Sequence, residues 1–343
     1  MLPDAPADTA AVLPALKPAL RHLPRSGWRV VAAKEFGDGI LSVRFIIVFA
    51  LLGLPAVGAV YATASYVSAN AQAATGAAGL FVLLFSHQDP GSKVPSFAAM
   101  IGLLGPLLGI AFGFDAINGE RAERTLPRLV AQPIHRDAVI IGKFAAGLAV
   151  IGVVLLSTTL IVSGVAFLVL AVTPSPDDIL RLAAWLVVSI AYIGFWLAFA
   201  MLCSAALRGA ATSVLTAIGL WIVATIFWGA LLVGLAANFL SPVPANPTVD
   251  QQIANAELQL NLARLSPGQL YSEASAYILD PSVQTVDIGA AVAQQNNARA
   301  IPSILPLEQS LSLAWPQLTA LLAFTVVCFG LGYISFMRQE VRA

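Results

Sequence analysis

The chain has 343 residues, of which 58% are hydrophobic and only 10% are charged, and its formal net charge is zero. Soluble domains carry about 25% charged residues, so this chain has too few charges to cover the surface of a soluble protein. The composition therefore indicates an integral membrane protein, and the balanced charge argues against a nucleic-acid partner.

Two segments are predicted before the first apolar run. Residues 1–26 are rich in Pro and Ala and are expected to form a disordered cytoplasmic tail without a cleavable signal peptide. Residues 27–44 alternate apolar and basic positions at helical spacing, which is typical of an amphipathic helix lying in the membrane interface. Its candidate interfacial side chains are Trp28, Arg29, Lys34 and Glu35. The alternative is a juxtamembrane anchor that only fixes orientation.

Six apolar runs are long enough to cross a membrane, because a spanning helix needs about 20 mainly apolar residues. They cover residues 45–65, 97–114, 148–170, 183–203, 212–236 and 316–336. The third run is extended at its start, and Lys143 there predicts that its first turns project from the membrane. The fold class predicted is an all-α integral membrane protein, in which residues 45–343 form a six-helix transmembrane domain.

The basic residues predict the orientation of these spans. With six spans, 14 of the 18 Lys and Arg residues fall on one side and four on the other. Basic residues concentrate on the cytoplasmic side of membrane proteins. Both termini are therefore predicted to be cytoplasmic, and residues 238–315 are predicted to form an external helical loop.

This external loop carries helix signals. Ser266 precedes Pro267, and Gln269 follows three residues after Ser266, a pattern that predicts an N-cap with a closed capping box. The helix is expected to run to about Leu279. Residues 249–265 have apolar positions on one face, which makes a second amphipathic helix plausible.

Signatures of catalysis are missing from the sequence. Gly142 and Lys143 are followed by Phe144, and no upstream glycine completes a phosphate-binding loop. The three histidines and two cysteines lack metal-ligand spacing. We therefore expect no catalytic, cofactor-binding or metal-binding residue in this chain. The span interiors carry no ionisable residue, which argues against an ion-coupled carrier.

Small and hydroxyl residues mark the spans instead. Gly105, Gly109 and Gly113 recur every four residues and predict close helix packing, either within the subunit or at a dimer seam. Ser163, Thr212 and Thr216 are candidate pore-lining residues. The alternative is that these hydroxyls bond the carbonyls of their own helices.

The segment 115–138, between the second and third spans, mixes both charge signs with apolar residues. It includes Leu126, Leu129 and Ile134, which need a partner surface if the segment lies in the cytoplasm. Docking of a cytoplasmic subunit is the favoured hypothesis, and a free loop is the alternative.

The sequence resembles the permease subunits of type-2 ABC exporters. In that family the corresponding loop is similar to E-x-E-x-G-T-L, followed by a Leu-rich stretch, a Pro, an Arg and a Gly-Lys pair. The matching residues are Glu120, Glu123, Thr125, Leu126, Leu129, Gln132, Pro133, Arg136, Gly142 and Lys143. Residues 34–36 and 265–271 also match, the latter within the long last external loop of one branch. Arg124 stands where the family has Gly.

The resemblance implies a separate cytoplasmic ATPase that binds ATP and Mg, and a pore formed with a second permease copy or a paralogue. Residues implied to couple to the ATPase are Glu120, Glu123, Arg124, Thr125, Leu126, Leu129, Pro133 and Arg136. The protein is expected to lie in a bacterial or archaeal inner or plasma membrane, where its spans contact lipid. The expected function is export of an amphiphilic or apolar substrate. The alternative is mechanotransmission to an external partner protein, for example in metallo-enzyme maturation.

Overall fold

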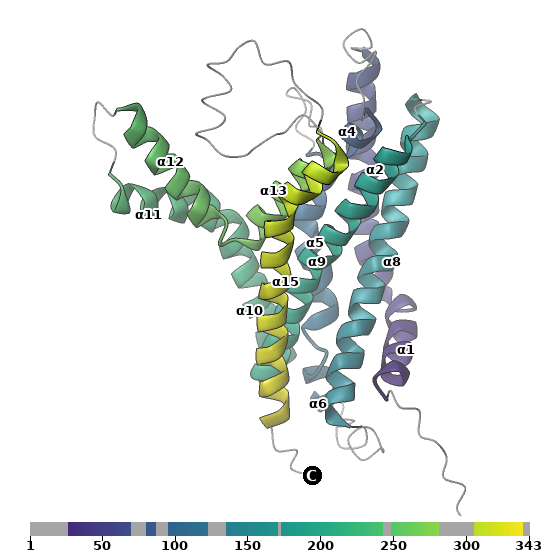
Figure 1. The fold of residues 1–343 in the computed structure, drawn as a ribbon. Coiled ribbons are helices and arrows are strands. Elements are labelled where there is room, and N and C mark those ends of the chain that lie inside the picture. Colours follow the sequence, from purple (N-terminus) through teal and green to yellow (C-terminus); the bar gives the residue numbers. More distant parts are fainter. Residues whose placement is uncertain are drawn as a thin grey trace, which may run out of the picture.

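The computed structural model describes residues 27–69, 80–86, 95–122, 135–170, 173–242, 248–280 and 305–338 (Figure 1). Within these ranges the secondary structure is helical and contains no strand. The helices are α1 (Gly27–Ile40), α2 (Val43–Ala69), α4 (Leu80–Ser86), α5 (Phe97–Gly113), α6 (Asn118–Ala122), α8 (Arg136–Leu170), α9 (Pro176–Ala206), α10 (Ala210–Ile222), the π-helix η1 (Val223–Leu232), α11 (Val233–Leu240), α12 (Val249–Ala263), α13 (Pro267–Leu279) and α15 (Leu307–Arg338).

Six described segments are long and apolar enough to cross a membrane, which confirms the six predicted spans. They are Val43–Tyr61, Phe97–Ala122, Arg136–Leu168, Pro176–Ala206, Ala210–Gly229 and Leu307–Arg338. Several helices extend beyond the predicted apolar runs. α8, for example, begins at Arg136, so the helix includes polar residues that precede the predicted apolar run 148–170.

The helices form an upright bundle with two distinct ends (Figure 1). We name the end that carries α1, α6 and the last turn of α15 the basal end, and the end that carries α4 and α13 the distal end. α9 packs against α5, α8, α13 and α15, and its large side chains Trp185, Tyr192 and Trp196 are buried. The core of the bundle is therefore built around α9.

The glycines of α5 serve packing within the subunit. A Cβ on Gly109 would lie 2.6 Å from the backbone oxygen of Ile193, and one on Gly113 would lie 2.7 Å from Cβ of Ala200. Both contacts are closer than real Cβ atoms tolerate, so α5 and α9 can touch along this stripe only because it lacks side chains. Of the two alternatives for these glycines, the structure supports packing inside one chain.

The fifth span leans away from the bundle. α10 packs against α9 and α5, whereas α11 and α12 project from the other helices in Figure 1. The middle of this span is the π-helix η1, whose wider turns are uncommon and often found at functional sites. Large side chains on it, such as Phe227 and Leu231, are about half exposed in the single chain.

The two helices of the loop predicted to be external agree with the sequence in position but not in capping. α12 and α13 begin and end close to the predicted residues, and Pro267 is the first residue of α13. The predicted capping box at Ser266 is wrong, because the Ser266 hydroxyl donates to the backbone oxygen of Ala224 instead. The amide of Gln269 donates to Glu273. A capping box does form at the start of α12, between Thr248 and Gln251.

The first helix is shorter than the predicted interval 27–44. α1 ends at Ile40, and a turn at Leu41 and Ser42 leads into α2. The Ser42 hydroxyl donates to the backbone oxygen of Gly39 and accepts from the backbone N–H of Phe45, which stabilises the turn. α1 packs along the basal part of α8. The predicted tail, 1–26, lies outside the described residues.

Candidate functional site

A buried lysine joins three helices at the basal end. The Nζ of Lys143, on α8, donates to Oε1 of Glu35 on α1 and to Oε1 of Glu120 on α6, each at 3.0 Å. The Lys143 side chain is 8% exposed, and those of Glu35 and Glu120 are 22% and 14% exposed. We call these three residues the basal triad. Its low exposure makes each charge dependent on its partners, since removing one partner leaves another charge buried and uncompensated.

The glycine beside Lys143 allows the triad to form. A Cβ on Gly142 would lie 2.7 Å from Cβ of Val31 and 2.8 Å from the backbone oxygen of Trp28. α1 can therefore lie directly on α8 only where α8 has no side chain. This close approach places Glu35 within hydrogen-bond distance of Lys143. Gly142 and Lys143 therefore act together in joining α1 to α8.

A second ion pair stands at the start of the segment 115–138. An Nη of Arg44, on α2, lies 2.6 Å from a carboxylate oxygen of Asp115, and its guanidinium lies 5.3 Å above the ring of Phe114. Asp115 belongs to the turn between α5 and α6. The pair therefore connects α2 to the segment in which Glu120 lies.

The turn between α5 and α6, together with α6, is also hydrogen-bonded to α9 and to Leu207, the residue after α9. The Ser204 hydroxyl, which is fully buried, accepts hydrogen bonds from the backbone N–H groups of Ile117 at 3.0 Å and Asn118 at 3.1 Å. Arg121 donates to the side-chain oxygen of Asn118 and to the backbone oxygen of Leu207. α6 is thus held by α8, by α1 through Lys143, and by α9.

A cavity of about 400 Å³ lies between these elements. Its charged lining residues are Glu35, Asp38, Arg44, Asp115, Glu120 and Lys143. Among the described residues, no group of three or more His, Cys, Asp or Glu side chains is placed to hold a metal ion. The arrangement is a set of ion pairs between helices, and it can transmit a displacement of α6 to α1, α2, α8 and α9.

Two of the eight predicted coupling residues lie in the described part of the chain. Glu120 belongs to the basal triad, and Arg136 is the half-buried first residue of α8. The other six lie outside the described residues: Glu123, Arg124, Thr125, Leu126, Leu129 and Pro133.

The predicted interfacial residues divide between two faces of α1. Trp28, Arg29 and Lys34 are exposed, and the Arg29 guanidinium lies 5.5 Å from the Trp28 ring centroid. Burial lowers the pKa of Lys34, but its neighbours Glu35 and Asp38 raise that pKa to a net value above the ordinary one. Glu35, in contrast, turns inward to Lys143. One face of α1 is therefore free to contact lipid while the other packs on α8.

The candidate pore residues do not line the cavity at the basal end. Thr212 and Thr216 are exposed on α10 and donate to the backbone oxygens of Gly209 and Thr212. Ser163 is partly buried on α8. A passage lined by the two threonines would have to lie outside this single subunit, against the exposed face of α10, so their pore role stays a prediction.

Two buried charged residues at the distal end were not singled out from the sequence. Arg181, which is 1% exposed, donates to the backbone oxygens of Ile278 and Leu305, to the Ser310 hydroxyl and to Asp177. It joins α9 to α13 and to the start of α15.

The second of these residues is Glu273 on α13, which is 2% exposed. Its carboxylate accepts from the guanidinium of Arg264 and from the side-chain amides of Gln269 and Gln317. In the sequence, Arg181 and Arg264 were counted only among the four basic residues on the side opposite the cytoplasm. The backbone oxygens of Ile278 and Leu305 that Arg181 bonds lie far away in the chain, so no local pattern indicated them. The available signal was an Arg four residues after Asp177 at the start of an apolar helix.

Comparisons with known proteins identify relatives over most of the chain. A family model described as ABC-2 family transporter protein matches residues 29–341. The chain is 27% identical over 222 residues to a probable ABC transporter permease protein NosY from Stutzerimonas stutzeri, an alignment covering 63% of this chain and 72% of the relative. It is 29% identical over 156 residues to a protein of the same description from Pseudomonas aeruginosa, covering 45% of this chain and 50% of the relative.

Proposed function

Because the chain belongs to the ABC-2 transporter family and is a multi-pass membrane permease subunit, we propose that it couples ATP hydrolysis by a separate cytoplasmic ATPase to export. In this proposal the basal end faces the cytoplasm and carries both termini, in agreement with the excess of basic residues there. The membrane is a bacterial or archaeal inner or plasma membrane. ATP and Mg bind to the partner.

The single observation that carries the proposal is the basal triad. The segment 115–138 is the proposed docking element for the ATPase, and Glu120 lies in its first part. Through Lys143, Glu120 is connected to the third span and to α1. A displacement of the segment therefore reaches the membrane helices through hydrogen-bonded charges rather than through a loose loop.

The proposed mechanism is a rigid-body rearrangement between two states. When nucleotide closes the ATPase dimer, the docked segment moves. α1, α6 and α8 move with it, because Lys143 on α8 bonds Glu35 on α1 and Glu120 on α6. The hydrogen bonds from Ile117 and Asn118 to Ser204 carry the same movement to α9. The ATPase supplies the energy through this connection.

The cargo proposed for this permease is amphiphilic or apolar. Ionisable side chains of the spans cluster near the helix ends, as at Lys143 and Arg181, rather than in the middle of the apolar stretches. A second permease copy, or a paralogue, would complete the passage against the exposed face of α10. Thr212 and Thr216 lie on that face.

Mechanotransmission to an external partner is the second candidate function, and the distal polar clusters favour it. Arg181 and Glu273 bond α13 to α9, α15 and the residues before α15, so movement of the spans also moves the distal helices. α12, which projects from the bundle in Figure 1, would then present the moving surface.

Reconstitution with the ATPase tests the proposal. The chain and a candidate ABC ATPase from the same organism would be co-expressed, purified as a complex and placed in liposomes containing a fluorescent lipid analogue. The proposal predicts a stable complex whose ATP hydrolysis drives the analogue across the bilayer. A chain that never assembles with an ATPase, or that works without one, contradicts it.

A further inference from the structure

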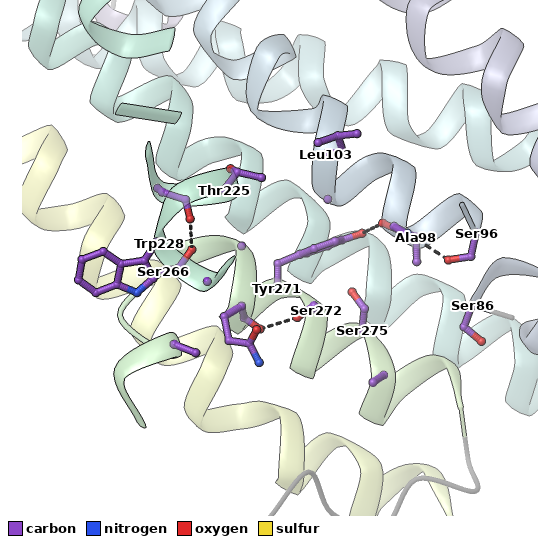
Figure 2. A pocket seen from close by; sticks show the side chains of 18 of the residues that line it. Ser86, Ser96, Ala98, Leu103, Thr225, Trp228, Ser266, Tyr271, Ser272 and Ser275 are labelled. Atoms are coloured by element: carbon purple, nitrogen blue, oxygen red, sulfur yellow. Dashed lines mark hydrogen bonds between the residues drawn. The ribbon is translucent and has the colours of Figure 1, made fainter. Parts of the chain in front are cut away.

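A cavity of about 550 Å³ opens at the distal end between α5, η1 and α13 (Figure 2). Trp228 and Ser266 lie on one side of it, Ser96 and Ala98 lie on the other, and Tyr271 lies between them. The cavity lies at the other end of the bundle from the basal triad, and its described lining includes neither Glu120 and Arg136 nor the candidate pore residues.

The polar lining of this cavity consists mainly of hydroxyl groups. They belong to Ser86, Ser96, Thr225, Ser266, Ser272 and Ser275. Asp280 is the one acidic lining residue, and the described lining contains no Lys, Arg or His. Among the described lining residues a bound anion would find no cation and would meet the Asp280 carboxylate, so this part of the lining favours an uncharged ligand.

Several of these hydroxyls already have partners within the fold. Ser266 donates to the backbone oxygen of Ala224, Ser272 donates to that of Gln269, and Ser275 accepts from the indole nitrogen of Trp185. The Ser86 Oγ is buried and has no hydrogen-bond partner in the described part of the chain. Native structures rarely leave such a group unsatisfied, so a bound hydrogen-bonding ligand would supply what it lacks.

The rest of the lining is apolar, and its α13 wall is fixed. The Tyr271 hydroxyl donates to the backbone oxygen of Ala98 at 3.2 Å, and its ring stacks on Tyr192 with centroids 4.6 Å apart. Burial raises the pKa of Tyr271 to about 12, so its hydroxyl is neutral at physiological pH. Leu103, on α5, is 42% exposed and adds an aliphatic surface.

The opposite wall belongs to the π-helix. Trp228 donates from its indole nitrogen to the backbone oxygen of Leu262, and Ser266 bonds Ala224, so η1 is attached to the link between α12 and α13. Gly229 lines the cavity, and a Cβ placed there would meet no atom within 4 Å. This wall therefore leaves open space next to the glycine.

We propose that this cavity binds an uncharged lipid-like amphiphile from the leaflet at the distal end. Its hydroxyl or amide head group lies among the serines, and its chain lies against Leu103 and Trp228. The site goes beyond the proposed export function, because a single subunit forms it and binding requires neither an ATPase nor a second copy.

Fluorescence quenching of Trp228 tests the proposal. The full-length chain, in nanodiscs without nucleotide, is titrated with brominated monoolein, which carries an uncharged glycerol head group. Quenching is expected to saturate, and the saturating part is expected to be absent from Trp228→Phe. Brominated lysophosphatidylglycerol, which adds a negative charge, should need at least about tenfold higher concentration. A large excess of free glycerol should not displace the brominated monoolein.

Filling the cavity provides the matched control. Gly229→Phe and, from the opposite wall, Ser272→Phe should each abolish the saturating component. Gly234→Phe should retain it, because Gly234 lies on α11 outside the cavity and its Cβ position is equally open. Retained saturation in both filled variants, equal or tighter binding of the anionic lipid, or displacement by glycerol would each overturn the proposal. Assembly with the ATPase is measured separately, so a failure here leaves the proposed export function untouched.

Discussion

Lys143 on α8 donates a hydrogen bond to Glu120 on α6 at 3.0 Å, although the two residues are 23 positions apart in the chain. Between them lies the rest of the charged segment in which the ATPase is proposed to dock. α6 cannot separate from α8 without breaking the Lys143–Glu120 pair, which is largely shielded from water, and Lys143 also bonds Glu35 on α1. This geometry fixes α6, the described start of the segment, to the basal part of the third span.

Adding a methyl group at Gly142 should displace α1. In Gly142→Ala the new Cβ would meet Val31 and the backbone of Trp28, so α1 must move off α8 and Glu35 must leave Lys143. Overpacking of this kind costs about 1–3 kcal/mol. We expect a lower midpoint of thermal unfolding and faster hydrogen–deuterium exchange along α1.

Gly37→Ala, on the same helix, is the control for this substitution because a Cβ there meets no atom within 4 Å. It should keep or raise the unfolding midpoint, since Gly is unfavourable in a helix. Equal exchange of α1 in both variants would contradict the packing argument.

Replacing Arg181 should loosen the distal end. Arg181→Met leaves the buried backbone oxygens of Ile278 and Leu305 without the guanidinium, and each unsatisfied buried acceptor costs about 1–3 kcal/mol, whereas Asp177 is 55% exposed and can be solvated by water. Arg181→Lys should recover only part of this loss, because an ammonium cannot reproduce the planar fork of the guanidinium. Thermal unfolding of the purified chain measures both variants.

Arg208→Met is the control for Arg181, because Arg208 is exposed at the other end of α9. A surface change of this kind is expected to alter the free energy of unfolding by within about 0.5 kcal/mol. Full stability in Arg181→Lys would show that charge alone, rather than the fork, holds α13.

Reversing the charge at Glu123 should separate the permease from the ATPase. Glu123 lies in the proposed docking segment, so Glu123→Arg should remove an attractive charge and introduce a repulsive one at that interface. Co-purified ATPase should fall by at least about tenfold while the unfolding midpoint of the chain stays unchanged. Unchanged assembly would reject the docking assignment.

A bulky residue on α10 distinguishes export from mechanotransmission. Thr216 is exposed in the single chain, so Thr216→Trp should not disturb the subunit itself. If a passage lies against this face, the variant should lose export of the fluorescent lipid analogue and keep ATPase assembly. Retained export would remove Thr216 from the passage.

Much of the fold was predictable because hydrophobic length is a strong signal. The six spans, and α13 beginning at Pro267, follow from apolar runs and from a proline at a helix start. The capping box at Ser266 was wrong because a tertiary acceptor, the backbone oxygen of Ala224 on the π-helix, competes for the hydroxyl. A sequence pattern cannot reveal that neighbour.

The site was predictable only in part, for the same reason. Glu35, Glu120 and Lys143 each matched a family pattern, but their contact depends on how α1 crosses α8 at Gly142. The burial of Arg181 and Glu273 was not predictable, because it depends on Leu305 and Gln317, which lie far away from them in sequence. Burial of charge is a property of the assembled bundle.

A double-mutant cycle on ATP hydrolysis tests the role of the triad most directly. Glu120→Gln, Lys143→Met and the combination are each assembled with the ATPase, and the increase in hydrolysis upon assembly is measured. The account predicts that each single change reduces this increase and that the combination reduces it no further than Lys143→Met alone, a non-additivity of about 0.5–3 kcal/mol. Strictly additive losses, or single variants that hydrolyse ATP like the unmodified complex, would contradict it.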